Sequence, residues 1–308
     1  MTGGPGAVLV MGEALIDLVP SPDDRLVQHA QPGGAPANVA AGLAALSTPS
    51  WFAGTLGGDG FGRAIEERLV SAGTELGLCG RSELPTALAV ADPGPDGTGY
   101  HFHLQDTATF RIAERAAEAG EFGAVYVGGL AAVVSPAAEA VAATARAAAE
   151  RSVLVVDPNV REDRTLDAES GGRRLRELCG LAGIVKASDE DVLRLWPGAD
   201  PGETCRRLAR EGEGRLVVLT RGSRGATAYT RAGEPVTVPA VPVEVVNTIG
   251  AGDAFMAAVL NWLSREGAFA RAGELSPAGV AEMLGFASRV AASVVAQEGT
   301  QPVPVPVS

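Results

Sequence analysis

The stretch NTIGAGDAF, residues 247–255, places two glycines, a small alanine and one carboxylate directly before a helical pattern. The residues that follow, MAAVLNWL (256–263), have the apolar spacing of a helix, so the sequence predicts a turn and a helix beginning near Gly252. The first N–H groups of a helix have no partner inside it, and glycines let a ligand approach them closely. The stretch is therefore a candidate anion site, although Asp253 could equally be an ordinary N-cap.

A second stretch of this kind lies near the start of the chain. PGGAPANVAAGLAAL (32–46) places Gly33, Gly34 and Pro36 ahead of another helix, with Asn38 in its first turn. By themselves the two glycines could be turn residues. Two helix starts that both follow glycines and both carry a polar side chain are less often accidental, and one could bind a phosphate while the other binds a polyol.

The second half of the chain alternates short apolar runs with helical segments. The runs, typical of strands buried on both faces, are 7–12, 124–129, 152–157, 183–188 and 215–220, and the helical segments are 136–150, 168–181 and 203–211. This alternation predicts βαβ units and a parallel sheet.

The first half differs because its apolar residues alternate with polar ones. The segments 14–20, 25–31, 86–92 and 99–105 are predicted to be antiparallel strands, and helices are expected near 36–46 and 60–72. The strands fall in two blocks, about 14–32 and 85–110, which we interpret as a small sheet forming a lid over a crevice. The proline-rich end, residues 300–308, is predicted to be extended or frayed.

The composition excludes several classes of protein. A formal net charge of −12 disfavours binding to nucleic acid or to an anionic membrane. The three cysteines have no C-x-x-C spacing, which argues against a disulfide framework and a structural zinc site, and the run AVLVMG (7–12) is too short to span a membrane. We therefore expect a cytoplasmic protein.

The chain also lacks the motifs of several enzyme classes. Its single lysine, Lys186, follows a valine, so there is no P-loop. Phe255 stands where a Rossmann motif would carry its third glycine, and no G-x-S-x-G is present. His29, His101 and His103 are the only histidines; the latter two share one strand face and could bind a metal, but solvated or packed histidines are the commoner case.

With these motifs in their order along the chain, the sequence resembles the ribokinase-like, or PfkB, carbohydrate kinases over essentially its whole length. GGAPANVA (33–40) is similar to the N-terminal signature of that family, and NTIGAGDAF to its C-terminal signature, D-T-x-G-A-G-D-x-F. The resemblance implies one domain, residues 1–308, with the family's fold: a three-layer α/β/α sandwich, a mostly parallel central sheet and a small antiparallel β lid.

The resemblance also implies roles for particular residues. Asp253 would be the base that takes a proton from a sugar hydroxyl, and the N–H groups of Gly250, Ala251, Gly252 and Asp253 would stabilise the transferring phosphoryl group. The implied sugar-binding positions are Asp17, Gly33, Gly34, Asn38 and Arg161. Without the resemblance, the sequence predicts only that Asp17 is an exposed strand residue and that Arg161 is an ordinary loop arginine.

ATP and Mg²⁺ are the implied cofactors. The positions expected to border the nucleotide are Lys186, Ser188, Thr220, Gly222 and Gly225. Asp191 would belong to the magnesium network. A role in a turn alone could explain Gly222 and Gly225. Asn247 stands where the family usually has the aspartate of a monovalent cation loop, so a K⁺ requirement is a weaker expectation.

The sequence is most similar to the fructokinase branch, which implies phosphorylation of fructose to fructose 6-phosphate. The alternative is a 2-keto-3-deoxygluconate kinase, in which Arg111 and Arg161 would clamp a carboxylate. A ribokinase is less favoured, as is a non-catalytic sugar or nucleotide sensor, because binding alone does not require Asp253. The expected partners are a sugar and ATP, with a possible homodimer through the lid.

Overall fold

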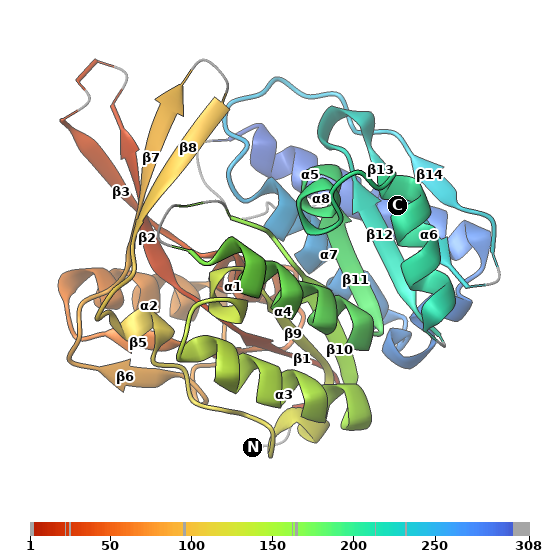
Figure 1. Cartoon of the computed structure of the whole chain (residues 1–308), viewed down its shortest axis with the longest axis horizontal. Coiled ribbons are helices and arrows are strands. Elements are labelled where there is room, and N and C mark those ends of the chain that lie inside the picture. The colour runs from red at the N-terminus through yellow and green to blue at the C-terminus, as the bar shows by residue number, and fades with distance from the viewer. Residues whose placement is uncertain are drawn as a thin grey trace.

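A mostly parallel eight-stranded sheet forms the centre of the computed structural model, which describes residues 3–297 except 22, 25, 95, 96, 162, 164, 165, 213 and 232. The strand order is β14-β13-β12-β11-β10-β9-β1-β4 (Figure 1). The strands are β1 (Gly4–Met11), β4 (Ser50–Ala53), β9 (Phe122–Gly128), β10 (Val153–Asp157), β11 (Ile184–Ser188), β12 (Leu216–Thr220), β13 (Ala226–Thr230) and β14 (Val236–Val238). The five strands predicted from apolar runs are confirmed, and the antiparallel strands β13 and β14, of which β14 is the edge, were not predicted.

Helices cover both faces of this sheet, which confirms the three-layer sandwich. One face packs against α1 (Ala35–Ala45), α2 (Gly60–Ala72), α7 (Ala251–Arg265) and α8 (Pro277–Val295). The other packs against α3 (Ala137–Arg151), α4 (Ala168–Leu181), α5 (Asp189–Leu195) and α6 (Pro201–Glu211), of which α3 and α4 lie in front in Figure 1. Alternate residues of each strand point to opposite faces, so Val8 and Val10 join the first layer while Leu9 and Met11 join the second.

A four-stranded lid, in the order β3-β2-β7-β8, projects from the sandwich (Figure 1). Its strands are β2 (Leu15–Pro20), β3 (Gln28–Gly33), β7 (Leu88–Gly94) and β8 (Gly97–His103), and a small separate sheet pairs β5 (Thr55–Gly57) with β6 (Gly80–Ser82). The two hairpins are antiparallel as predicted, but β2 and β7 pair in parallel. Thr109 bridges the two hairpins where they leave the sandwich, because its hydroxyl accepts from Ala87 N–H and donates to Ala14 C=O.

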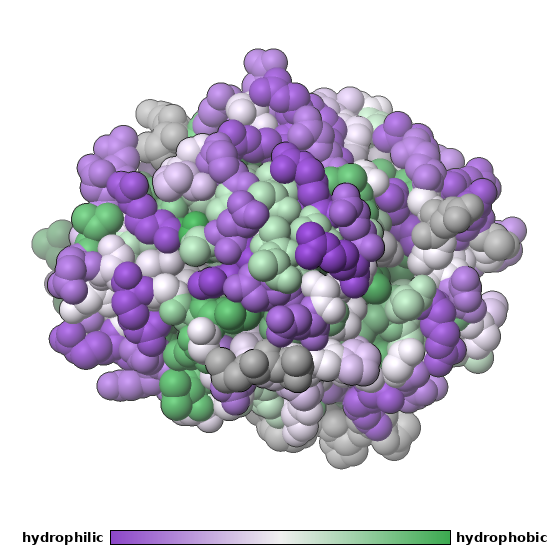
Figure 2. Space-filling model, turned by 90° about the horizontal axis from the view of Figure 1, so that it is seen from below, coloured by the Kyte–Doolittle hydropathy of each residue, from purple (hydrophilic) through white to green (hydrophobic). Residues whose placement is uncertain are grey.

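Short 3₁₀ turns complete the described structure: η1 (Ala108–Phe110), η2 (Ala119–Glu121), η3 (Leu130–Ala132), η4 (Gly222–Arg224) and η5 (Phe269–Glu274). Among the described helices, α8 alone is long and apolar enough to cross a membrane, but half of it is buried inside the protein, where it packs on α7 as a core helix does. Polar residues are spread over the side of the molecule shown in Figure 2, with smaller apolar groups between them. Residues 300–308, predicted to be extended, lie outside the described part of the chain.

Candidate active site

The amino ends of α1 and α7 meet at one point, although they are far apart in the sequence. Gly34, with φ 95°, precedes α1, and Gly250, with φ 79°, precedes α7, so both helices begin after a backbone conformation that favours glycine. Asn38 Nδ2 in the first turn of α1 donates a hydrogen bond of 2.8 Å to Asp253 Oδ2 in the first turn of α7. The two glycine-introduced helix starts therefore form a single site.

Asp253 is a buried carboxylate that does not cap its helix. The side chain is 9% exposed, and α7 has no side-chain cap. Burial raises the pKa of Asp253 above its usual range, while the hydrogen bond from Asn38 and the charge of Lys186 act in the opposite direction. A carboxyl group with a raised pKa beside open helix N–H groups has the properties of a general base next to an anion site.

Asp17 lies in β2 on the lid side of this centre, next to a glycine that makes room for it. A Cβ atom on Gly33 would lie 2.0 Å from Asp17 Oδ2. Burial raises the pKa of Asp17 to about 6, although the charges of Arg161 and Arg68 lower it. Asp253 raises it further, so the two carboxylates are close enough to interact electrostatically.

Gly34 is required for two reasons. A Cβ atom at this position would lie 2.7 Å from the carbonyl oxygen of Glu13, and its φ of +95° is one that other residues rarely adopt. The close approach brings the loop before α1 against the end of β1.

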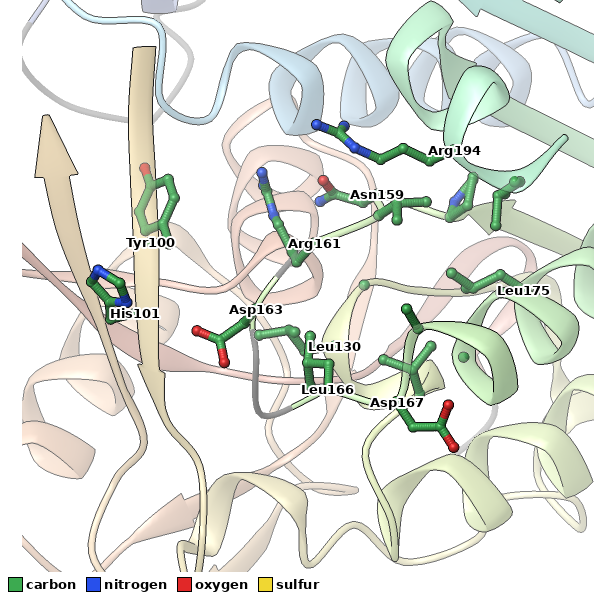
Figure 3. Close-up of a pocket in the computed structure, with 18 residues that line it drawn as sticks. Tyr100, His101, Leu130, Asn159, Arg161, Asp163, Leu166, Asp167, Leu175 and Arg194 are labelled. Carbon is green, nitrogen blue, oxygen red and sulfur yellow. The ribbon is translucent and has the colours of Figure 1, made fainter. Parts of the chain in front are cut away.

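Arg161 follows β10 and faces the same centre. Its guanidinium lies over the Tyr100 ring, 6.0 Å from the centroid, and its charge lowers the pKa values of Asp17 and Asp253. Together with Tyr100 and Asn159 it lines a cavity of about 530 Å³ (Figure 3). Asp253 does not line this cavity, which lies beside the Asn38–Asp253 centre.

Arg111 and Arg161 line different cavities, which share Leu166 and Asp167, so the carboxylate clamp stays a prediction. Arg111 lines a different cavity, of about 1000 Å³, and its nearest acidic partner is Asp106 at 3.8 Å. The reason is positional, since Arg111 follows η1 below the lid whereas Arg161 lies at the carboxyl end of a central strand.

Two buried acidic residues near this centre were not predicted. Glu13 follows β1, and its carboxylate accepts hydrogen bonds from Leu130 N–H at 3.1 Å and Ala131 N–H at 2.9 Å. Burial raises the pKa of Glu13 to about 7, against the effect of these bonds. Asp157 ends β10 and accepts a 2.7 Å hydrogen bond from Lys186 Nζ. Their position directly after buried strands is the sequence signal that could have found them.

Ser188 and Asp191 form a capping box at the start of α5. Ser188 Oγ accepts from Asp191 N–H at 3.0 Å, and Asp191 Oδ2 accepts from Ser188 N–H at 2.8 Å. The second carboxylate oxygen accepts from Val160 N–H at 2.7 Å. Asp191 therefore caps α5, and its place in a magnesium network stays a prediction.

The remaining nucleotide-side positions lie at the carboxyl end of β12. Thr220 ends the strand and is half-buried, and Gly222, with φ 52°, has no atom near the position of a Cβ. A Cβ atom on Gly225 would lie 2.1 Å from Val238 C=O, so packing against β14 explains this glycine without a ligand.

No cluster of three or more His, Cys, Asp or Glu side chains that could hold a metal occurs in the part of the chain that the structure describes. His101 and His103 are both exposed on β8. Asn247 Oδ1 accepts from Ile249 N–H at 2.9 Å and so shapes the turn before α7. The donors present therefore suit a metal that arrives with phosphate oxygens better than one held by protein ligands alone.

Comparison with known proteins identifies the family. The model of the pfkB family carbohydrate kinases matches residues 6–307. The chain belongs to this family. A fructokinase from Rhizobium leguminosarum bv. trifolii is 31% identical over 259 residues, which cover 82% of this chain and 78% of the relative. A fructokinase from Escherichia coli is 31% identical over 265 residues, 84% of this chain and 85% of the relative.

Solved structures of pfkB kinases share the same fold. A Xylella fastidiosa fructokinase with bound ATP aligns with a TM-score of 0.86 at 26% identity, over 97% of this chain and 95% of that one. A Vibrio cholerae O395 fructokinase in a form that contains fructose, ADP and calcium aligns with a TM-score of 0.82 at 26% identity, over 96% and 94% of the two chains. These similarities favour fructokinase over the 2-keto-3-deoxygluconate alternative.

Proposed function

We propose that this protein transfers the γ-phosphoryl group of ATP to the terminal primary hydroxyl of fructose, giving fructose 6-phosphate. The observation that carries the proposal is the meeting of two glycine-introduced helix starts through Asn38 and Asp253. The fructokinase relatives indicate the substrates, because one of the similar structures contains fructose and ADP and another contains ATP.

Asp253 is the general base in this mechanism. Its carboxylate accepts the proton of the fructose hydroxyl while that oxygen attacks the γ-phosphorus and the bond to the ADP oxygen breaks. The N–H groups of Gly250, Ala251, Gly252 and Asp253 lie at the positive end of α7, where they stabilise the negative charge on the transferring group. Glycine is required there because backbone donors can reach a phosphate only where no side chain intervenes.

The sugar side is formed by Asp17, Asn38 and Arg161. Asn38 donates to Asp253, and its buried Oδ1 has no hydrogen-bond partner among the described residues, so we expect it to accept from a sugar hydroxyl when the sugar binds. The Asp17 carboxylate accepts from a second hydroxyl. Gly33 and Gly34 contribute by leaving room for Asp17 and for the loop before α1.

The nucleotide side is formed by Lys186, Ser188, Thr220 and Gly222. Mg²⁺ would be held chiefly by ATP phosphate oxygens, with Asp191 contacting it through water, and would neutralise phosphate charge. A monovalent cation loop around Asn247 is a weaker part of the proposal, although one of the similar fructokinase structures contains potassium.

The test is a panel of sugars with ATP, comparing fructose with ribose and 2-keto-3-deoxygluconate by coupled ADP release. Fructose should give the highest kcat/KM. Asp253→Asn should lower kcat by roughly 10²–10⁴-fold while leaving ATP binding intact, because it removes a positioned base. An Asp253→Asn enzyme that turns over at the wild-type rate, or a chain that releases ADP at the same rate with and without any sugar, contradicts the proposal.

A cytoplasmic location and a homodimer through the lid complete the proposal. Leu26 and Val27, in the turn before β3, are 93% and 49% exposed, which supports lid pairing in solution. Sedimentation that shows only monomer at micromolar concentration would remove the dimer.

A further inference from the structure

The single lysine of the chain is buried at the amino end of α7. Lys186 Nζ lies 2.7 Å from Asp157 Oδ2, and the two side chains are 7% and 0% exposed. On its other side, a Cβ atom on Gly252 would lie 3.3 Å from Nζ. The ammonium group is therefore between Asp157 and the first turn of α7.

The register of the sheet explains this arrangement. β10 and β11 pair in parallel with Val156 opposite Val185, so Asp157 and Lys186 are the next neighbours across the two strands. Val155 and Ile184, two residues earlier on each strand, pack in the core layer that contains α7, and alternation points Asp157 and Lys186 to the same side.

A role in stability alone does not account for the pair. Replacing a buried ion pair by apolar residues is often neutral or stabilising, so such a pair is weak evidence for stability. Within the described part of the chain, the buried Oδ1 of Asp157 also has no hydrogen-bond partner. Burial disfavours the charged form of Lys186, but Asp157, Asp191 and Asp253 all face it and raise its pKa above the usual value.

We propose that Asp157 is a positioning residue that holds the Lys186 ammonium against the amino end of α7, where Lys186 contacts the phosphoryl group during transfer. The inference rests on the proposed kinase function. Asp157 fixes the orientation of the Lys186 side chain and keeps its amine protonated. The charge of Lys186 then adds to the positive potential that the N–H groups of α7 create at the same place. The carboxylate itself touches neither substrate.

Kinetics of matched variants test the coupling. Asp157→Asn keeps the shape of the side chain and removes its charge; we expect kcat to fall roughly 10- to 100-fold, with KM for fructose changed less than about twofold. The kcat of Lys186→Met should fall by at least the same factor. The double variant should be no slower than Lys186→Met, because Asp157 acts through Lys186. Glu139→Gln, which breaks the 2.9 Å ion pair with Arg174 away from the site, is the control and should keep wild-type kinetics.

Chemical labelling tests the position of Lys186 without turnover. Lys186 and the α-amino group of the chain are its only primary amines, so mass spectrometry after treatment with acetic anhydride and digestion measures N-acetylation of one lysine and uses the α-amino group as the internal standard. ATP without sugar should slow acetylation of Lys186 at least tenfold and leave the α-amino group unaffected, whereas fructose alone should change neither. Asp157→Asn should increase the ATP-free rate at Lys186, because the amine loses the carboxylate that keeps it protonated.

Two results would overturn the inference: acetylation of Lys186 at the same measurable rate with and without ATP, or a double variant slower than Lys186→Met by the full factor of Asp157→Asn. If a variant fails to fold, as judged by its thermal melt, labelling of the wild-type protein decides. A wild-type enzyme that does not phosphorylate fructose would contradict the proposed function, while protection of Lys186 by ATP would still test the placement of the cation.

Discussion

Gly33→Ala should weaken fructose binding by displacing the Asp17 carboxylate. The new Cβ would lie 2.0 Å from Asp17 Oδ2 and 2.8 Å from Asp17 Cγ, whereas ordinary contacts begin at 3.4 Å. The carboxyl group must therefore retreat by more than 1 Å (2.0 to 3.4 Å). Because Gly33 is not among the residues with positive φ, alanine is sterically compatible with its backbone, and the perturbation acts on Asp17 alone.

The expected effect follows from the hydrogen bond that is lost. A hydrogen bond to a charged group contributes about 1.5–3 kcal/mol, which corresponds to a rise in KM for fructose of about 10- to 150-fold. KM for ATP should stay within about twofold, since the nucleotide side is untouched. The assay is coupled ADP release at pH 8, where Asp17, whose burial raises its pKa to about 6, is ionised.

Two further variants make this prediction decisive. Gly180→Ala adds a methyl group where no atom lies within 4 Å, so its kinetics should match the wild type. Asp17→Ala combined with Gly33→Ala should be little worse than Asp17→Ala, because the methyl group then has no carboxylate to displace. A Gly33→Ala enzyme with normal KM for fructose, or a double variant that shows both losses in full, would refute the reasoning.

Three more changes have defined outcomes. Asn38→Ala removes a donor that lowers the pKa of Asp253, so the acid limb of kcat/KM should move to higher pH and kcat should fall at least about tenfold, as a pH–rate profile would show. Tyr126→Phe deletes a buried hydroxyl with no hydrogen-bond partner among the described residues, so the free energy of unfolding in urea should stay equal or rise by up to about 1 kcal/mol. A fall of more than about 1 kcal/mol would mean that the hydroxyl is hydrogen-bonded in the folded protein. Replacing K⁺ by a large organic cation should lower the rate of the wild type only modestly, and it should lower the rate of Asn247→Asp further. Equal rates in both salts for both the wild type and the variant would exclude a role for K⁺.

The sequence predicts the central strands well because burial on both faces leaves an unbroken apolar run. The same reasoning misses β13, in which threonines interrupt the apolar residues, and the short edge strand β14. It also cannot give the parallel pairing of β2 with β7. That pairing joins two chain segments that no local pattern connects, and Thr109 bonds to both of them.

The candidate site also contains some residues that the sequence could predict and others that it could not. Glycines and a carboxylate at a helix start are visible as a local pattern, which is why Asp253 and Asn38 could be proposed together before their contact was known. Glu13 and Asp157 were missed because a carboxylate after a strand reads as a turn residue unless its partner is known. The clamp of Arg111 with Arg161 stays a prediction, and spacing along the chain does not reveal that the two line different cavities.

The distribution of charge explains how a chain with a formal net charge of −12 can bind ATP. Lys186, Arg161 and Arg68 all lower the pKa of Asp253, so three cations act on the point where the phosphoryl group would be transferred. Arg68, which was not predicted, lies on α2, donates to Pro32 C=O at 3.1 Å and is half-buried. Cations held beside buried carboxylates act over a few ångströms and are screened little by salt, while the acidic surface repels phosphates at longer range. Nucleotide binding by this chain must therefore depend on local geometry at the amino end of α7, because the long-range field opposes it.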